Sequence, residues 1–332
     1  MNHQKIKILL ESVCGRSYNA HIPGKWISVI SLAQGLSGEN MIIVKLIGGL
    51  GNQMFQYAAG RCLAHKYRTE LKLDIRDFKN YTLRNYDLNG FSIIENFATS
   101  SELSRILFPS DRCDVKFFKR VIWSVSRIQP VEYIKETEYS FQQNFFKLPD
   151  NIYLDGYWQS EKYFSDIENI LRNEFSIINP LTSTSQELAE RIRNCEAVSL
   201  HVRRGDYVSD PKTNSVHGVC GVDYYSNAID MIRERIENPC FFIFSDDSEW
   251  ARSNIKPDAP TTYVKHNDYP RDYEDMCLMS MCKHNIIANS SFSWWGAWLN
   301  ENPEKIVIAP KKWFNSKNMD TQDLLPDKWH KL

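Results

Sequence analysis

Two adjacent arginines, Arg203 and Arg204, have the clearest chemical potential in this sequence. They follow residues 197–202, an apolar run typical of a buried strand that includes His201. A core cannot accept both guanidinium groups, and such groups bind phosphate oxygens in pairs. At a strand end they suggest a diphosphate clamp, in which arginine and a helix dipole replace Mg²⁺. On spacing alone, a surface ion-pair cluster with Asp206 is an equally good interpretation.

Two further polar groups follow apolar runs in the same half of the chain. Asn289, Ser290 and Ser291 precede a predicted helix, where hydroxyl and amide groups either bind an anion or cap the helix. Asp246 and Asp247 can accept hydrogen bonds from a purine or a ribose. Taken alone, these two aspartates are better explained as helix caps.

A parallel sheet would bring these groups together. Short apolar runs alternate with helical segments in the second half, at residues 197–202, 240–244, 262–264, 285–288 and 305–308. This alternation predicts a Rossmann-like α/β domain. Ligands of such sheets bind beyond the carboxyl ends of the strands, where all these polar groups fall.

A glycine-rich turn near the start of the chain carries a second candidate site. Asn52 and Gln53 end the segment GGLGNQ and offer amide groups to sugar hydroxyls. A structural turn, with Asn52 in a left-handed conformation, is an equally good explanation. The segment matches a dinucleotide fingerprint only partly, because Met54 stands where a small residue is needed.

The elements around this turn predict the opening of a βαβ unit. A strand at residues 41–47 and a second at 71–75 flank a helix predicted over residues 54–67. Residues 1–40 lack this patterning and are interpreted as an N-terminal extension, with Met41 as the natural start. No topology is predicted between residues 79 and 179.

Composition excludes several classes of protein. The 332 residues include 40 lysines and arginines against 41 aspartates and glutamates, which gives no overall attraction to nucleic acid. The 8 cysteines are scattered and are read as reduced thiols, and neither cysteine nor histidine shows metal-ligand spacing. No apolar run reaches the roughly 18 residues that cross a bilayer.

Four segments, in this order, resemble bacterial α-1,2-fucosyltransferases of glycosyltransferase family 11. They are GGLGNQMFQY at residues 48–57, HVRRGDY at 201–207, FSDD at 244–247 followed by Trp250, and NSSFSWWG at 289–296. The resemblance extends from Met41 nearly to the end of the chain. Its arginine segment is shared with other transferases that use GDP-fucose, so the donor is better supported than the linkage.

The resemblance implies an α/β fold of GT-B type, with two Rossmann-like domains whose parallel sheets face each other across a cleft. Residues 41–180 would form the acceptor-side domain and residues 181–332 the GDP-fucose-binding domain. The implied reaction is the inverting transfer of L-fucose from GDP-β-L-fucose to the 2-hydroxyl of a terminal galactose. It needs neither a metal nor another cofactor.

The resemblance also implies roles for individual residues. The catalytic group would be Arg203 on the β-phosphate, with Arg204 and Asp206 completing or orienting that motif. The donor would be bound by Arg203 together with His201, Asp246, Asp247, Asn289, Ser290 and Ser291. Asn52 and Gln53 would lie in the cleft beside fucose or acceptor. No motif identifies the general base, and Asp206 qualifies only if it escapes pairing with an arginine.

Three alternatives remain open. The GDP-fucose site could serve another linkage or acceptor, the chain could be an NAD-dependent oxidoreductase, or it could be a non-catalytic glycan-binding protein. The last would use the tryptophans at residues 294–298, for which a place in the helix core is favoured. The expected partners are GDP-fucose and a galactose-terminated glycan, lipid-linked or free, and no nucleic acid. A cytoplasmic enzyme with at most peripheral contact at the inner membrane face is expected.

Overall fold

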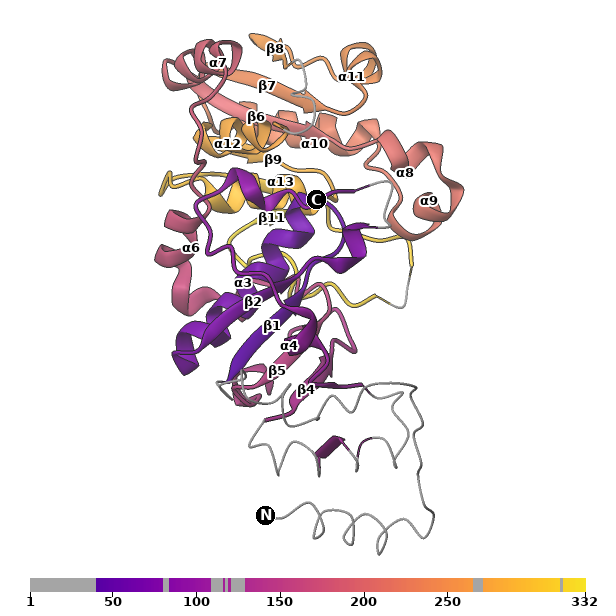
Figure 1. The fold of residues 1–332 in the computed structure, drawn as a ribbon. Coiled ribbons are helices and arrows are strands. Elements are labelled where there is room, and N and C mark those ends of the chain that lie inside the picture. Colours follow the sequence, from indigo (N-terminus) through magenta and orange to yellow (C-terminus); the bar gives the residue numbers. More distant parts are fainter. Residues whose placement is uncertain are drawn as a thin grey trace, which may run out of the picture.

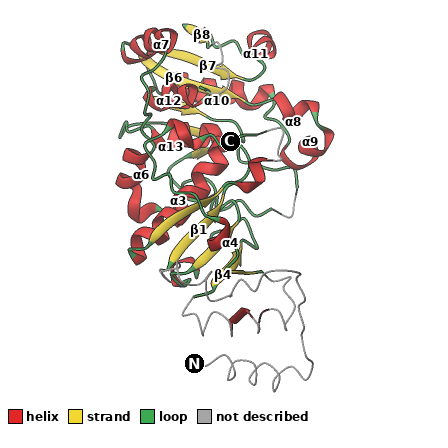
Figure 2. Ribbon diagram, viewed as in Figure 1, coloured by secondary structure: helices red, strands yellow, loops and turns green. Residues whose placement is uncertain are grey.

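The computed structural model describes residues 40–79, 84–108, 116, 119–120, 129–264, 271–316 and 319–332. These residues form two parallel sheets, one from each half of the chain, with helices around both (Figures 1 and 2). Of the predicted N-terminal extension, residues 1–39 lie outside the described part. Met41, the predicted natural start, is the first residue of β1.

The first sheet has the order β2-β1-β5-β4-β3. Its strands are β1 (Met41–Lys45), β2 (Glu70–Asp74), β3 (Ile106–Leu107), β4 (Val131–Lys135) and β5 (Ile152–Asp155). β1 pairs in parallel with β2 on one side and β5 on the other. Its sequence MIIVK is apolar up to the last residue, as expected for a strand covered on both faces.

The second sheet has the order β11-β10-β9-β6-β7-β8, again with parallel pairs. Its strands are β6 (Glu196–Val202), β7 (Pro239–Ser245), β8 (Thr261–Tyr263), β9 (His284–Ile286), β10 (Val307–Ala309) and β11 (His330–Lys331). The two sheets confirm the predicted α/β class and provide the arrangement that the GT-B prediction requires.

The helices connect and cover the strands. They are α3 (Leu50–Tyr67), α4 (Ser100–Leu103), α6 (Glu168–Glu174), α7 (Ser183–Arg193), α8 (Gly205–Ser209), α9 (Pro211–His217), α10 (Val222–Arg233), α11 (Ser248–Asn254), α12 (Tyr273–Met281) and α13 (Ser291–Leu299). Short 3-10 turns are η1 (Arg76–Lys79), η2 (Leu88–Gly90), η3 (Phe145–Lys147), η4 (Glu161–Tyr163) and η5 (Ser165–Ile167).

The glycine turn differs from its prediction in one respect. α3 begins at Leu50 rather than Met54, so Asn52 is helical and not left-handed. The residue that needs a left-handed backbone is Gly48, with φ 79°. The turn is therefore confined to two glycines, and the amide side chains lie on the first turn of the helix.

A continuous aromatic core joins the two halves. α3 and α13 lie side by side in the middle of the molecule (Figure 1). The ring of Phe55 lies 4.5 Å from Trp294 and 5.0 Å from Trp295, and both tryptophans are fully buried. The tryptophan run is therefore core, as favoured, and not an exposed platform for sugars. The predicted boundary near residue 180 separates the sheets but does not divide this core.

Candidate active site

The carboxyl edge of the second sheet gathers the polar segments that the sequence singled out. β6 lies between β7 and β9, and Val202 pairs with Ser245 at the ends of their strands. Arg203 and Asp246, the next residues, are therefore neighbours. Residues 289–291 follow β9 on the other side of β6. The strand order therefore places the segments after β6, β7 and β9 at one edge of the sheet, as predicted.

Carboxylates hold both arginines in place. Arg203 Nη1 lies 2.8 Å from Asp246 Oδ2, and the same guanidinium pairs with Asp206. Arg204 Nε donates to Asp247 Oδ2 at 3.0 Å. Both arginines remain partly exposed, at 21% and 17% of their side chains. Since a guanidinium has five donors, each arginine keeps capacity for a further anion.

Two local features shape this cluster. A Cβ on Gly205 would stand 2.6 Å from Asp246 Oδ2, so a glycine lets the carboxylate reach the arginine segment. Trp250 packs under the Arg204 guanidinium, 4.0 Å from its ring centroid. Asp247 also accepts from the backbone N–H of Trp250 at 3.1 Å, so the helix-cap interpretation of Asp247 is confirmed alongside its ion pair.

The N-termini of α3 and α13 meet beside the sheet edge that carries these arginines. A Cβ on Gly51 of α3 would lie 2.4 Å from the carbonyl carbon of Ser291 and 2.6 Å from the backbone nitrogen of Phe292. Trp295 Nε1 donates to the Gly51 carbonyl at 3.0 Å and fastens the two helices. Ser290, at the N-cap of α13, makes no side-chain cap hydrogen bond. The positive ends of two helix dipoles therefore converge, which favours an anion.

Arg84 is a third arginine of the cluster, and sequence reasoning missed it. Its Nη2 donates to Asp206 Oδ2 at 2.7 Å, which links the first half of the chain to α8. Its side chain lies against Gly49, whose Cβ would stand 3.7 Å from Arg84 Cδ. Asp206 is thus paired with both Arg84 and Arg203, so it fails the condition set for a general base.

Two predicted contact residues, Gln53 and Asn289, are buried and hydrogen-bonded within the fold. Gln53 is fully buried, and its Nε2 donates to the carbonyls of Gly48 at 2.9 Å and Asn85 at 2.8 Å. Its Oε1 accepts from the backbone of Asp87. Asn289 is 2% exposed and donates to the carbonyls of nearby loops. Both amides hold loops together, because their donors bind backbone carbonyls and their oxygens accept from the Asp87 backbone and from Cys220 Sγ.

The other predicted contacts keep their candidacy. Asn52 is half-buried and accepts a hydrogen bond from Gln159 Nε2 at 2.8 Å. His201 is 6% exposed on β6, with its ring 5.8 Å from that of Phe292. Its predicted contact with guanine stays a prediction.

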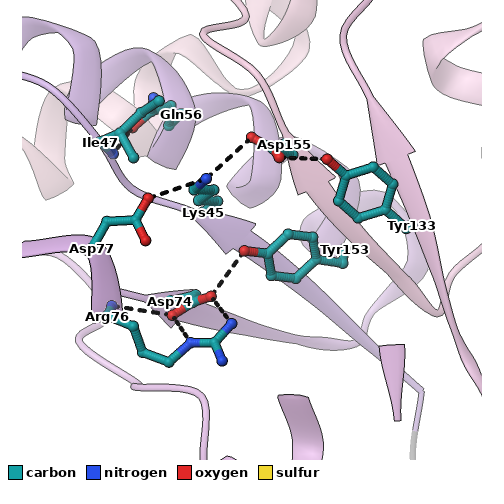
Figure 3. Close-up of polar contacts among 9 residues, drawn as sticks. All are labelled: Lys45, Ile47, Gln56, Asp74, Arg76, Asp77, Tyr133, Tyr153 and Asp155. Carbon is teal, nitrogen blue, oxygen red and sulfur yellow. Dashed lines mark hydrogen bonds and ion pairs between the residues drawn. The ribbon is translucent and has the colours of Figure 1, made fainter. Parts of the chain in front are cut away.

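The carboxyl edge of the first sheet carries a separate polar cluster (Figure 3). Lys45, at the end of β1, lies 3.1 Å from Asp77 and 3.8 Å from Asp155. The Tyr133 hydroxyl donates to the same Asp155. Burial tends to lower the pKa of Lys45, but these two carboxylates raise it above its ordinary value.

A second part of this cluster is centred on Asp74, at the end of β2. Arg76 binds both carboxylate oxygens, at 2.9 and 2.8 Å, and the Tyr153 hydroxyl donates at 2.8 Å (Figure 3). Burial opposes ionisation, but these hydrogen bonds hold the pKa of Asp74 below its ordinary value. The cluster is therefore satisfied by its own partners.

Two carboxyl groups titrate in the neutral range. Burial raises the pKa of Glu136 to about 7, against the backbone donors of Tyr157 and Trp158. Burial and the negative charge of Asp272 raise the pKa of Asp87 to about 7, against Arg84. A general base of a reaction run near neutral pH needs such a value.

Further observations concern only the part of the chain that the structure describes. Within it, no group of three or more histidine, cysteine, aspartate or glutamate residues is placed to hold a metal ion. No described helix is long and apolar enough to cross a membrane. The six described cysteines are free, as predicted: Cys62, Cys195, Cys220, Cys240, Cys277 and Cys282.

Comparison with known proteins establishes the family. The sequence profile of glycosyl transferase family 11 matches residues 105–332. An alpha-1,2-colitosyltransferase of Escherichia coli is 38% identical over 300 residues, which cover 88% of this chain and 99% of the relative. The chain belongs to glycosyltransferase family 11.

Other members support this assignment. The O-antigen biosynthesis glycosyltransferase WbnK of Escherichia coli is 36% identical over 304 residues, covering 86% of this chain and 99% of the relative. The galactoside alpha-(1,2)-fucosyltransferase 1 of Saimiri boliviensis boliviensis is 26% identical over 263 residues, which cover 76% of this chain and 63% of the relative.

Solved structures resemble this family 11 chain more distantly. An alpha-1,6-fucosyltransferase, NodZ, co-crystallized with GDP, has a TM-score of 0.45 and 13% identity, covering 78% of this chain and 92% of its own. FUT1 of Arabidopsis thaliana in complex with GDP has a TM-score of 0.49 and 12% identity. The match covers 92% of this chain and 78% of FUT1. At this level of similarity neither structure contributes to the functional argument.

Proposed function

We propose that this family 11 enzyme transfers L-fucose from GDP-β-L-fucose to the 2-hydroxyl of a terminal galactose, with inversion. One observation carries the proposal: three arginines and two helix N-termini converge at one sheet edge. That combination suits the diphosphate of a nucleotide sugar. The α-1,2 linkage is supported by the names of the relatives, two of which are called alpha-1,2 transferases.

In this proposal the diphosphate binds the spare donors of the arginines, which stay paired with their carboxylates. Arg203 binds the β-phosphate, and Arg84 and Arg204 add charge-assisted hydrogen bonds. Ser290 and the free N–H groups of α13 bind the same group. His201 and Asp247 face the guanine. As the bond from fucose C1 to the β-phosphate oxygen breaks, these cations stabilise the charge on the leaving GDP without a metal.

The acceptor hydroxyl attacks C1 from the opposite face as the bond to the β-phosphate oxygen breaks, and its proton passes to solvent water. Asp206 does not serve as base, because two arginines occupy its oxygens. A dissociative path with weak base assistance fits an active site whose strongest feature is stabilisation of the leaving group.

One finding favours a second donor. The relative that is 38% identical is named a colitosyltransferase. Colitose is L-fucose without its 3-hydroxyl, so the two donors differ by a single group. A competition assay with GDP-fucose and GDP-colitose decides between them by the ratio of kcat/KM values.

The remaining parts of the proposal concern the partners and the cellular setting. The enzyme is proposed to work without metal or cofactor, in the cytoplasm, on a galactose-terminated glycan that is free or lipid-linked. Any membrane contact is peripheral. Nucleic acid is not a partner.

The decisive experiment is a transfer assay with the purified chain, GDP-fucose and lactose in the presence of EDTA, with the product linkage read by NMR. An α-1,2-fucosylated product supports donor, linkage and metal independence together. Product of another linkage would keep the donor and discard the linkage. Calorimetry with GDP and titration with NADH test the alternatives, since an oxidoreductase binds NADH and a glycan-binding module binds neither nucleotide.

A further inference from the structure

The turn after β5 has an unusual backbone. Trp158 has φ 55°, a left-handed conformation that bulky residues rarely adopt, and its ring is fully buried. Such a conformation persists only where the surroundings hold it, and it is found at sites where a side chain must be aimed. The residues around this turn therefore have to hold its backbone in place.

Glu136, which follows β4, holds the turn from one side. Its carboxylate accepts the backbone N–H of Tyr157 at 2.6 Å and of Trp158 at 3.0 Å. A Cβ on Gly156 would stand 2.4 Å from Glu136 Cβ, so only glycine lets the two segments come this close. The strained turn is thus fixed by the half-buried carboxylate of Glu136 and by the absence of a side chain at Gly156.

The turn presents Gln159 towards the glycine segment of α3. Gln159 is 7% exposed, and its Nε2 donates to Asn52 Oδ1 at 2.8 Å. Its Oε1 is buried and has no hydrogen-bond partner among the described residues. Leaving a buried amide oxygen unpaired is costly, so such an atom in a fixed side chain indicates a missing partner.

The surroundings indicate what that partner is. Asn52 Nδ2 packs against Gly48, and the neighbouring Gly49 lies against Arg84, which pairs with Asp206 of the arginine cluster. Gln159 is thus connected through Asn52 and the glycine turn to the proposed diphosphate site. The group attached to the diphosphate, and the group that attacks it, are sugars rich in hydroxyl donors.

We infer that Gln159 is a sugar-binding residue whose Oε1 accepts a hydrogen bond from a hydroxyl of the donor fucose or of the acceptor galactose. Asn52 orients the carboxamide, and Glu136 positions the turn that carries it. The inference rests on the proposed function, because it takes the arginine cluster as the diphosphate site. It assigns Gln159 to the carbohydrate and not to the nucleotide.

The test compares Gln159→Leu with Gln186→Leu, a matched change at an exposed glutamine of α7. We expect Gln159→Leu to lower kcat/KM at least 10-fold while the Kd for GDP stays within twofold. A raised KM for lactose assigns the hydroxyl to the acceptor, and a raised KM for GDP-fucose assigns it to the donor. Gln159→Glu, which retains acceptor oxygens, should recover part of the activity and serves as a second variant if the leucine variant does not fold.

Several results would overturn the inference. They are unchanged kinetics in folded Gln159→Leu, an equal loss of GDP affinity, or an equal loss in the Gln186→Leu control. If the wild-type chain does not transfer fucose, the proposed function fails, and the inference is then judged by binding alone. Gln159→Leu must in that case weaken GDP-fucose relative to GDP, or weaken lactose in the presence of GDP; if neither changes, Gln159 does not bind sugar.

Discussion

The carboxyl edges of the two sheets carry charged residues of different character. At the first edge, Asp74 is 4% exposed and satisfied by Arg76 and Tyr153. At the second edge, Arg203 and Arg204 keep a fifth of their surface exposed and lie beside converging helix N-termini. Both edges follow the rule that polar groups gather beyond parallel strands, and both carry partly exposed cations. At the second edge, however, three arginines lie together beside the converging helix N-termini.

This difference separates a structural edge from the edge that we propose to bind the diphosphate. A buried carboxylate with a full set of donors stabilises the fold and has little left for a substrate. A row of arginines balanced by aspartates can bind phosphates in addition, because the guanidinium groups have spare donors. Substitutions at the two edges should therefore affect different properties.

The largest effect is expected at the second edge. Arg203→Ala and Arg204→Ala should each lower kcat/KM roughly 100-fold, or about 3 kcal/mol of transition-state stabilisation, because charge on the leaving diphosphate loses its partner. The melting curve should change little, since the three ion pairs of these arginines are partly exposed. Arg233→Ala, on the exposed pair with Asp258, is the control. Near-normal turnover in both variants would rule out the clamp.

The second prediction concerns the contact between α3 and α13. Gly51→Ala places a Cβ 2.4 Å from the backbone of Ser291, which cannot move as a side-chain tip would. We expect a loss of about 3 kcal/mol in the free energy of unfolding, measured in urea, and weaker GDP binding. Gly221→Ala is the matched control, because nothing lies within 4 Å of its Cβ. Equal stability of the two variants would contradict the contact.

The sequence predicted the second edge better than the first. Apolar runs made the central strands of the second sheet readable, and β6 to β10 each overlap one of the predicted runs. α9 was missed because its sequence PKTNSVH has no apolar period, although Asp210 caps it and Pro211 begins it. β4 was missed because it alternates with charged residues, and its partner β3 has only two residues.

The site shows the same limit. The arginine motif and the two aspartates lie within a few residues of strand ends, so their meeting could be predicted from strand order alone. Arg84 belongs to a loop without a motif, and only the fold brings it to Asp206. The hydrogen bonds of Gln53 to Asn85 and Asp87 could not be foreseen, because these partners come from a segment whose structure was not predicted.

The third prediction tests the first edge as a structural cluster. Tyr153→Phe removes the hydroxyl that donates to buried Asp74, and should cost about 1–2 kcal/mol of unfolding free energy. GDP affinity and kcat/KM should not change. Tyr133→Phe, whose hydroxyl meets the more exposed Asp155, should cost less. If Tyr153→Phe weakens GDP binding, the distinction between the two edges fails.

The smallest expected effect is a pH dependence at Glu136. Its pKa is raised by burial from the ordinary 4.5 to about 7, so between these values the folded state binds more protons than the unfolded state. The free energy of unfolding should therefore fall as pH rises through this window and level off above it. Because the Glu136 side chain is partly exposed, we expect the free energy of unfolding to fall by about 1 kcal/mol, less than the whole pKa shift would give.

Glu136→Gln isolates this contribution. The glutamine cannot ionise, and its amide group adds a pH-independent cost where it meets the backbone N–H of Tyr157 or Trp158. We would measure the free energy of unfolding in urea at pH 5, 6, 7 and 8. Relative to wild type, the free energy of unfolding of the variant should rise by about 1 kcal/mol across this range. Asp87 titrates in the same range in both proteins and cancels in the difference. Glu138→Gln is the control for the loss of an acidic side chain. If the unfolding free energies of Glu136→Gln and wild type change in parallel with pH, Glu136 is not desolvated and the prediction fails.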